Sequence, residues 1–340
     1  MRADADQHYR RGNELRAAGR AAEAEAALRE ALALAPGHAD AALSLAFLLR
    51  EQGRLRAASE TILARWHAQP RVRDDDLRSL AFLRECQQPD AAEAVAVAAL
   101  ERFPDDAALL ALAGENALDR GAFAIARDRL AASVERDPSR APAWLRLAHT
   151  HRFDDRDDAD LARMRAARAD TSGGEDVQIA LCFALGKAHD DLGDFADAAA
   201  FFREGNERAK RRRGGWSREG WRRRFVEQQS RAPPLLTLCE REDFIPVFIV
   251  GLPRTGTTLA ATLLGRYPAV CNRGELNWLA ALAARLGPTP PSSALTAAAM
   301  LLHAQLRQDD APARFYIDKN PLNFRHLGLI AALFPNARVI

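Results

Sequence analysis

The hydrophobic pattern divides the chain into two parts. Up to about residue 208, small and large apolar residues return at a regular period, which predicts pairs of packed helices. From residue 244 on, the run Ile245–Val250 is short and rich in β-branched and aromatic residues, which predicts a buried parallel strand. We expect further strands at 314–318 and 337–340, and helices at 259–264, 280–287, 294–308 and 321–334.

Prolines mark the period of the first part, because Pro36, Pro70, Pro104 and Pro138 lie 34 residues apart. This is the length of the tetratricopeptide repeat (TPR), and residues 1–208 resemble a TPR solenoid. In such a repeat, small residues let two helices approach closely, and each proline ends the second helix. The residues in matching positions are Gly12, Ala24, Leu28 and Ala31 in the first repeat, Leu45, Ala46, Gly53 and Ala58 in the second, and Gly114, Gly121, Ala126 and Leu130 in the fourth.

The solenoid is predicted to be irregular around 150–175. A fifth repeat begins at Ala141 and gives way to Asp154–Asp158, a run of four carboxylates and one guanidinium. This run is expected to be a solvated break or a helix cap, with a metal site as the alternative. Thr171–Gly174 predicts a loop, and one more TPR-like hairpin follows from 177 to 206.

A basic helical linker is predicted over 209–243. Its clusters Lys210–Arg213 and Arg222–Arg224 are expected to form a solvated helical face. Two other interpretations stay open, namely electrostatic help for a polyanionic cofactor or an acidic acceptor, and nucleic-acid binding.

The loop after the first strand has the geometry of an anion cradle. Gly251 and Gly256 allow backbone conformations closed to other residues, and the loop leads directly into a helix. Its N–H groups and the free donors of the helix start would converge on a phosphate. The G-x-x-x-x-G spacing is that of the nucleotide-binding P-loop, but Thr257 occupies the position of the P-loop lysine. A P-loop kinase or NTPase is therefore the weaker alternative.

Three motifs resemble those of sulfotransferases that use 3′-phosphoadenosine 5′-phosphosulfate (PAPS). Pro253–Thr258, P-R-T-G-T-T, is similar to their 5′-phosphosulfate loop. Pro268–Leu276 and Asp318–Phe324 resemble two segments of the tyrosylprotein-sulfotransferase-like branch. The whole chain resembles bacterial TPR-sulfotransferases. The fold implied is a multidomain one, an α-helical TPR solenoid followed by a P-loop-like, three-layer α/β domain over 244–340.

The resemblance implies sulfuryl transfer from PAPS to an acceptor hydroxyl, for which a protein tyrosine is one candidate, without a metal ion. The TPR repeats would position the acceptor or a protein partner in their groove. Glu275 would accept the acceptor proton, Lys319 would stabilise the transferring group, and Arg254 would assist. Read without the resemblance, Glu275 is a charge near a helix N-terminus and Lys319 a surface lysine, while Asp318 orients the neighbouring loop. The residues implied to hold the 5′-phosphosulfate are Pro253, Arg254, Thr255, Gly256, Thr257 and Thr258.

The family's segments that hold the cofactor's 3′-phosphate would follow the strand at 337–340. We therefore expect 244–340 to be the N-terminal part of a sulfotransferase domain. A non-catalytic TPR scaffold for protein interactions, with a truncated nucleotide-binding domain, is the alternative.

Composition adds few constraints. The net charge of +2 gives no reason to expect nucleic acid or a membrane as a partner. The N-terminus lacks the apolar core of a secretion signal, and no run reaches the length of a membrane span, so a cytoplasmic protein is expected. The four cysteines are far apart and predict neither a zinc site nor a disulfide framework: Cys86, Cys182, Cys239 and Cys271.

Overall fold

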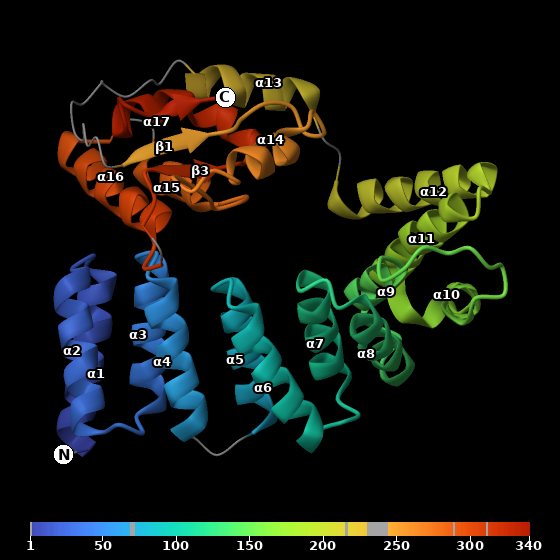
Figure 1. Ribbon diagram of the computed structural model, residues 1–340, viewed down its shortest axis with the longest axis horizontal. Coiled ribbons are helices and arrows are strands. Elements are labelled where there is room, and N and C mark those ends of the chain that lie inside the picture. Colours follow the sequence, from blue (N-terminus) through green and yellow to red (C-terminus); the bar gives the residue numbers. More distant parts are fainter. Residues whose placement is uncertain (1, 69–71, 215–216, 230–243, 288–289, 311) are drawn as a thin grey trace. The chain divides into compact units, whose positions relative to one another are not determined.

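The computed structural model describes residues 2–68, 72–214, 217–229, 244–287, 290–310 and 312–340 (Figure 1). The chain divides into two compact units. One comprises Met1–Ala58 and Ser217–Ile340, and the other Ser59–Trp216. Pro70, Cys239 and parts of the predicted linker, 215–216 and 230–243, lie outside the described residues. Within the described residues, no helix is both long and apolar enough to cross a membrane.

The first part of the chain consists of helices that pack in pairs, as the period predicts. Figure 1 shows the pairs α1 and α2, α7 and α8, and α11 and α12. The helices are α1 (Arg2–Ala17), α2 (Ala21–Leu34), α3 (Ala39–Glu51), α4 (Leu55–Ala68), α5 (Arg73–Glu85), α6 (Pro89–Arg102), α7 (Ala107–Asp119) and α8 (Phe123–Arg136).

The predicted close approach of paired helices is confirmed. A Cβ atom added to Gly12 would lie 2.7 Å from Leu28 Cγ, and one added to Gly114 would lie 2.7 Å from Leu130 Cγ. Ala126 is fully buried in the same layer. The second helices α2, α6 and α8 each end two residues before their proline. Glycine at these two positions leaves room for the leucine side chain of the paired helix.

Helix α9 (Ala141–Ala148) precedes the region predicted to be irregular, which contains α10 (Ala159–Ala169) and the 3-10 turn η1 (Thr171–Gly173). The helices α11 (Gly174–Asp191) and α12 (Phe195–Arg213) then pack as a pair, where one more hairpin was predicted. Apolar residues of α9, α10 and α11 belong to one core, because Trp144 and Phe153 are buried together with α11. The basic end of α12 is partly paired, since Arg212 binds Asp176 at 2.6 Å and 2.9 Å. The basic helix α13 (Arg218–Gln229) follows.

Among the described residues of the C-terminal part, four parallel strands form one sheet in the order β2-β3-β1-β4. They are β1 (Ile245–Phe248), β2 (Val270–Asn272), β3 (Phe315–Asp318) and β4 (Arg338–Val339). The connecting helices are α14 (Thr257–Leu264), α15 (Trp278–Leu286), α16 (Ser292–Arg307), the 3-10 turn η2 (Pro321–His326) and α17 (Leu327–Leu333).

Each face of this sheet has its own core. Phe248 and Tyr316 pack with leucines of α15, α16 and α17 on one face. Val247 and Ile317 pack with Ala261 of α14 on the other. Alternate side chains of a strand point to opposite faces, so this arrangement confirms the predicted three-layer α/β domain after the helical repeats.

Two details differ from the sequence-based expectation. Strand β2 was not predicted, because it has three residues and only partial burial. The helix expected over 321–334 is a 3-10 turn followed by α17. The tighter turn has a local cause, since Asn320 accepts a hydrogen bond from the Leu322 N–H at 3.1 Å and Asn323 binds Asp318 at 2.9 Å.

Candidate active site

The predicted site residues lie at one edge of the sheet. Strands β2, β3 and β1 are adjacent and parallel, so their carboxyl ends meet at the same edge. The turn with Glu275 follows β2, Lys319 follows β3, and the glycine loop 251–256 follows β1. Open α/β sheets bind their ligands at this edge.

The glycine loop is held in an unusual backbone conformation. Gly251 (φ +146°), Arg254 (φ +71°) and Gly256 (φ +88°) all have positive φ. For Arg254 this conformation costs about 1–2 kcal/mol. The Thr255 hydroxyl donates to Leu252 O at 2.8 Å, and the Gly251 N–H donates to Pro321 O at 3.1 Å. Backbone strain of this kind is common where a loop is shaped to meet a ligand.

The loop is open to a ligand from solvent. Arg254, Thr255 and Thr258 are exposed, and Thr257 is half-buried at the first turn of α14. Within the described parts of the chain, the Arg254 side chain has no hydrogen bond or ion pair. The loop thus presents a guanidinium, two hydroxyls and the positive end of a helix on one surface.

Lys319 and Glu275 form an ion pair, although they are 44 residues apart in the chain. The lysine side chain is 7% exposed and the glutamate side chain 62% exposed. The structure therefore brings these two predicted residues together, with the ammonium group in the interior and the carboxylate reaching solvent. The roles of Glu275, Lys319 and the loop residues stay predictions at this point.

Buried polar groups hold the turn that carries Glu275. The Lys319 N–H donates to Gly274 O at 2.8 Å, and Asn320 Nδ2 donates to Leu276 O at 3.0 Å. Asp318 accepts from the Leu276 N–H at 3.4 Å, so it contacts the neighbouring loop as predicted. Asn320 was missed as a site-forming residue, although it stands within the Asp318–Phe324 motif.

Asp318 is the buried carboxyl group of this network. Burial raises its pKa to about 7, despite the hydrogen bonds from the Leu276 N–H and Asn323, which lower it. The nearby Glu275 carboxylate raises the pKa further, while Lys319 lowers it. The neutral and charged forms of Asp318 are therefore both populated near neutral pH.

This shift predicts a pH dependence of stability. The unfolded chain releases the Asp318 proton near pH 4 and the folded protein near pH 7, so its stabilising contribution is full below about pH 4 and is lost as the pH rises to about 7. Relative to Asp318→Asn, the free energy of unfolding of the natural protein is expected to fall by about 3 kcal/mol between pH 5 and pH 8. Urea unfolding at both pH values measures this, and a constant difference would contradict it.

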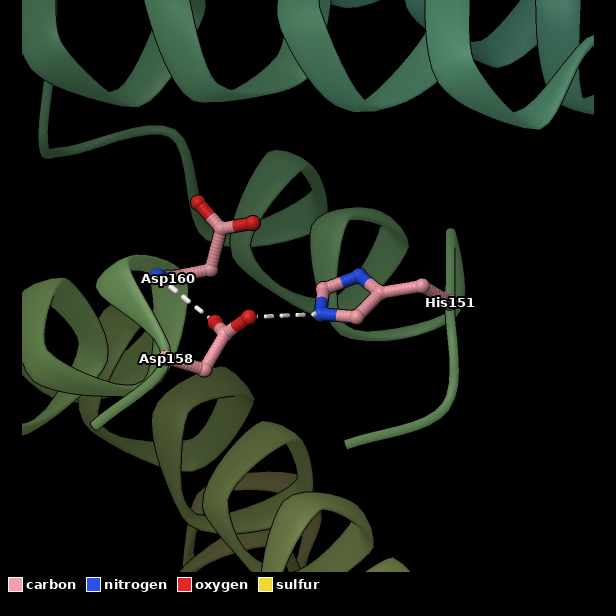
Figure 2. Close-up of side chains that lie close together, drawn as sticks. All are labelled: His151, Asp158 and Asp160. Atoms are coloured by element: carbon pink, nitrogen blue, oxygen red, sulfur yellow. Dashed lines mark hydrogen bonds and ion pairs between the residues drawn. The ribbon is translucent and has the colours of Figure 1, made fainter. Parts of the chain in front are cut away.

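Two other groups combine one histidine with two carboxylates among the described residues: His151, Asp158 and Asp160, and His189, Asp194 and Asp197. Figure 2 shows the first group, in which Asp158 accepts from the Asp160 N–H at 2.8 Å and lies 3.3 Å from His151. Arg127 pairs with both carboxylates. The predicted cap is confirmed for Asp158, which precedes α10 and accepts hydrogen bonds from the Asp160 and Leu161 N–H groups.

The unit Ser59–Trp216, which we call the helical unit, has a hollow of about 590 Å³ between α7, the α8–α9 turn and α11. Its lining combines apolar residues with charged ones of both signs, and the lining residues are Ala111, Glu115, Asp137, Ser139, Arg140, Ala141, Pro142, Ala143 and Asp176.

Three segments of the chain match known families. Residues 246–340 match a sulfotransferase family, and residues 15–80 and 179–211 match tetratricopeptide repeats. An uncharacterized protein of Aquifex aeolicus (strain VF5) is 34% identical over 113 residues, which take in 28% of this chain and 15% of that protein. The match thus spans a small part of the relative's length.

The solved structures that are similar to this chain include those of MamA and YrrB. A crystal structure of MamA protein is 13% identical and covers 64% of this chain and 98% of its own, with a TM-score of 0.40. YrrB, described as a TPR protein with an unusual peptide-binding site, is 20% identical and covers 58% of this chain and 91% of its own, with a TM-score of 0.36.

Proposed function

Because this chain combines TPR repeats with a C-terminal sulfotransferase family domain, we propose that it transfers a sulfuryl group from PAPS to an acceptor hydroxyl. The observation that carries the proposal is the contact between Lys319 and Glu275. It lies at the edge of the sheet where the glycine loop follows β1. A cation, a carboxylate and an anion-binding loop are the groups that this transfer needs.

Each group has a defined part in the proposed step. Arg254 and the N–H groups and hydroxyls of 255–258 bind the 5′-phosphosulfate of the donor. The acceptor oxygen attacks sulfur, and the bond from sulfur to the bridging phosphate oxygen breaks. Lys319 stabilises the charge that develops on the transferring group and the leaving oxygen. The acceptor proton passes to Glu275, and 3′-phosphoadenosine 5′-phosphate leaves.

The contact between Lys319 and Glu275 has a consequence for this step. In the contact, the Lys319 ammonium group occupies a Glu275 oxygen that would otherwise meet the acceptor proton. We propose that the donor competes for Lys319 when it binds, because its sulfuryl oxygens are themselves acceptors for the ammonium group. Glu275 is then released toward the acceptor, and its exposed carboxylate is placed to meet it.

The protein-binding part of the proposal concerns the TPR repeats. The hollow lined by Glu115, Ser139 and Arg140 offers both charges and a hydroxyl, which suits a polar peptide segment of an acceptor protein. Peptide binding that is lost on Ser139→Arg, which would fill the hollow, supports this assignment. Unchanged peptide binding would place the acceptor site elsewhere.

Donor binding is the first test. The desulfated donor, 3′-phosphoadenosine 5′-phosphate, is expected to bind the 340-residue chain in calorimetry through the contacts of its 5′-phosphate with the loop. Arg254→Ala is expected to weaken this binding by about 10- to 100-fold, because a charge-assisted hydrogen bond contributes about 1.5–3 kcal/mol. Arg266→Ala is the matched control, since Arg266 is also exposed but follows the other end of α14.

ATP with Mg²⁺ is the comparison ligand. Tighter binding of ATP with Mg²⁺ than of 3′-phosphoadenosine 5′-phosphate would contradict the proposal and favour a P-loop NTPase. Equal effects of Arg254→Ala and Arg266→Ala would show that the loop arginine has no specific contact with the donor.

A further inference from the structure

Arg273 is a buried residue near the candidate site, and its guanidinium group donates four hydrogen bonds. It lies between β2 and Gly274, and its side chain is 5% exposed. Its Nε donates to Leu306 O at 2.8 Å, and Nη2 donates to Arg307 O at 2.6 Å and to Asp310 Oδ1 at 2.7 Å. Nη1 donates to the second oxygen of Asp310. The guanidinium also lies 5.5 Å from the centre of the Tyr316 ring.

These contacts suit a charged group in the interior. Burial disfavours the charged form, but the hydrogen bonds and charge of Asp310 outweigh it, so the pKa of Arg273 lies above its ordinary value. Two of the acceptors are the last carbonyl groups of α16, where the helix dipole is negative. Arg273 therefore fixes the end of α16 to the end of β2.

The backbone after Arg273 leads directly to Glu275. The Arg273 N–H donates to Ile317 O at 2.9 Å, which continues the pairing of β2 with β3. Gly274 then turns the chain with φ +70°. On the other side of Glu275, Leu276 is buried and is held by Asp318 and Asn320. Glu275 thus projects from a short turn between two buried anchors.

We propose that Arg273 is a positioning residue for Glu275. Its bonds to the end of α16 and to Asp310 fix one side of the turn, which places the Glu275 carboxylate against Lys319 and toward the acceptor. This inference rests on the proposed function, because it assigns Arg273 a part in the same transfer. A residue that only stabilised α16 would affect folding and leave the chemistry of Glu275 unchanged.

Amide hydrogen exchange tests whether Arg273 holds the turn that carries Glu275. Arg273→Lys keeps the charge but loses the forked bonds, and it is expected to speed amide exchange in the peptide over 272–278. Arg65→Lys is the matched control, because Arg65 is 6% exposed, pairs with Asp75 and lies in the helical unit. The control is expected to leave exchange over 272–278 unchanged. Equal exchange in the natural protein and Arg273→Lys would overturn the inference.

Turnover of PAPS with a tyrosine peptide tests whether Arg273 affects sulfuryl transfer through Glu275. Arg273→Lys is expected to lower kcat by about 10²-fold, since small misplacements of a catalytic group have effects of this size. The Kd of 3′-phosphoadenosine 5′-phosphate is expected to stay unchanged. In a Glu275→Gln background, Arg273→Lys is expected to have no further effect on kcat, because the two changes act through one group. Additive losses would overturn the inference.

A second variant tests the same contact of Arg273. If Arg273→Lys does not fold, Asp310→Asn makes the milder change, because Asp310 is the partly exposed partner of the same contact. It is expected to give the same exchange and kinetic pattern to a smaller extent. If the natural protein binds no 3′-phosphoadenosine 5′-phosphate, the proposed function fails, and the effect of Arg273 on sulfuryl transfer fails with it. The exchange comparison would still decide whether Arg273 holds the turn.

Discussion

Glu275→Gln is expected to lower kcat for sulfuryl transfer by about 10²- to 10⁴-fold and to leave the affinity for 3′-phosphoadenosine 5′-phosphate unchanged. Glutamine has the shape of glutamate and still offers Lys319 an acceptor oxygen, so the ion pair becomes a hydrogen bond and the turn keeps its contacts. It cannot accept the acceptor proton. Single-turnover release of 3′-phosphoadenosine 5′-phosphate from PAPS, with a tyrosine peptide as acceptor, measures the loss.

The control for this change is Glu30→Gln, which alters an exposed glutamate on α2 and is expected to keep full activity. Full activity of Glu275→Gln would exclude Glu275 as the base. A loss of donor binding in Glu275→Gln would indicate that the carboxylate acts through Lys319 on binding and has no separate part in proton transfer.

The structure bears on the simpler interpretation of Glu275 as a charge that favours a helix N-terminus. Helix α15 begins at Trp278, three residues after Glu275, and its preceding residue Asn277 makes no side-chain cap. The Glu275 carboxylate contacts the ammonium group of Lys319. This contact favours a part in the site over a part in starting the helix.

Local patterns in the sequence predicted the loop well. A run of apolar residues, two glycines and a helical stretch are neighbours in the chain, so β1, the loop and α14 follow from short-range preferences. The contact between Glu275 and Lys319 could not be found in this way. It depends on the pairing of β2 with β3, and β2 is too short for its pattern to be recognised.

The polar anchors of the site were also missed, for a physical reason. Arg273 and Asn323 belong to residue types that are usually exposed. In the sequence, Arg273 stands where no strand or helix was predicted, and Asn323 stands at the start of the helix expected over 321–334. Their burial is set by partners far along the chain, Asp310 for the arginine and Asp318 for the asparagine in its turn after β3. Only the folded sheet brings these groups into one network.

The repeat period predicted more of the packing contacts than the motifs of the site did. In a solenoid, the residues that pack together lie at fixed, short separations along the chain. Leu130 is fully buried and fills the space beside Gly114 that a Cβ would occupy. The same pairing recurs between Gly12 and Leu28 in the first repeat. The repeat period therefore predicts which residues pack against each other. A substitution that removes one such contact tests the prediction.

Leu130→Ala is expected to lower the free energy of unfolding of the helical unit by about 2–5 kcal/mol, measured by urea unfolding with far-ultraviolet circular dichroism. The substitution removes methyl groups from a closed layer, and the glycine opposite cannot fill the cavity. Ile125→Ala on the same helix α8 is the matched control, since Ile125 is 46% exposed, and its expected change is about 0.5 kcal/mol or less. Equal losses for the two variants would mean that Leu130 does not pack against Gly114 in solution. A loss confined to Leu130→Ala would show that the recurring glycine and leucine positions hold the repeats together.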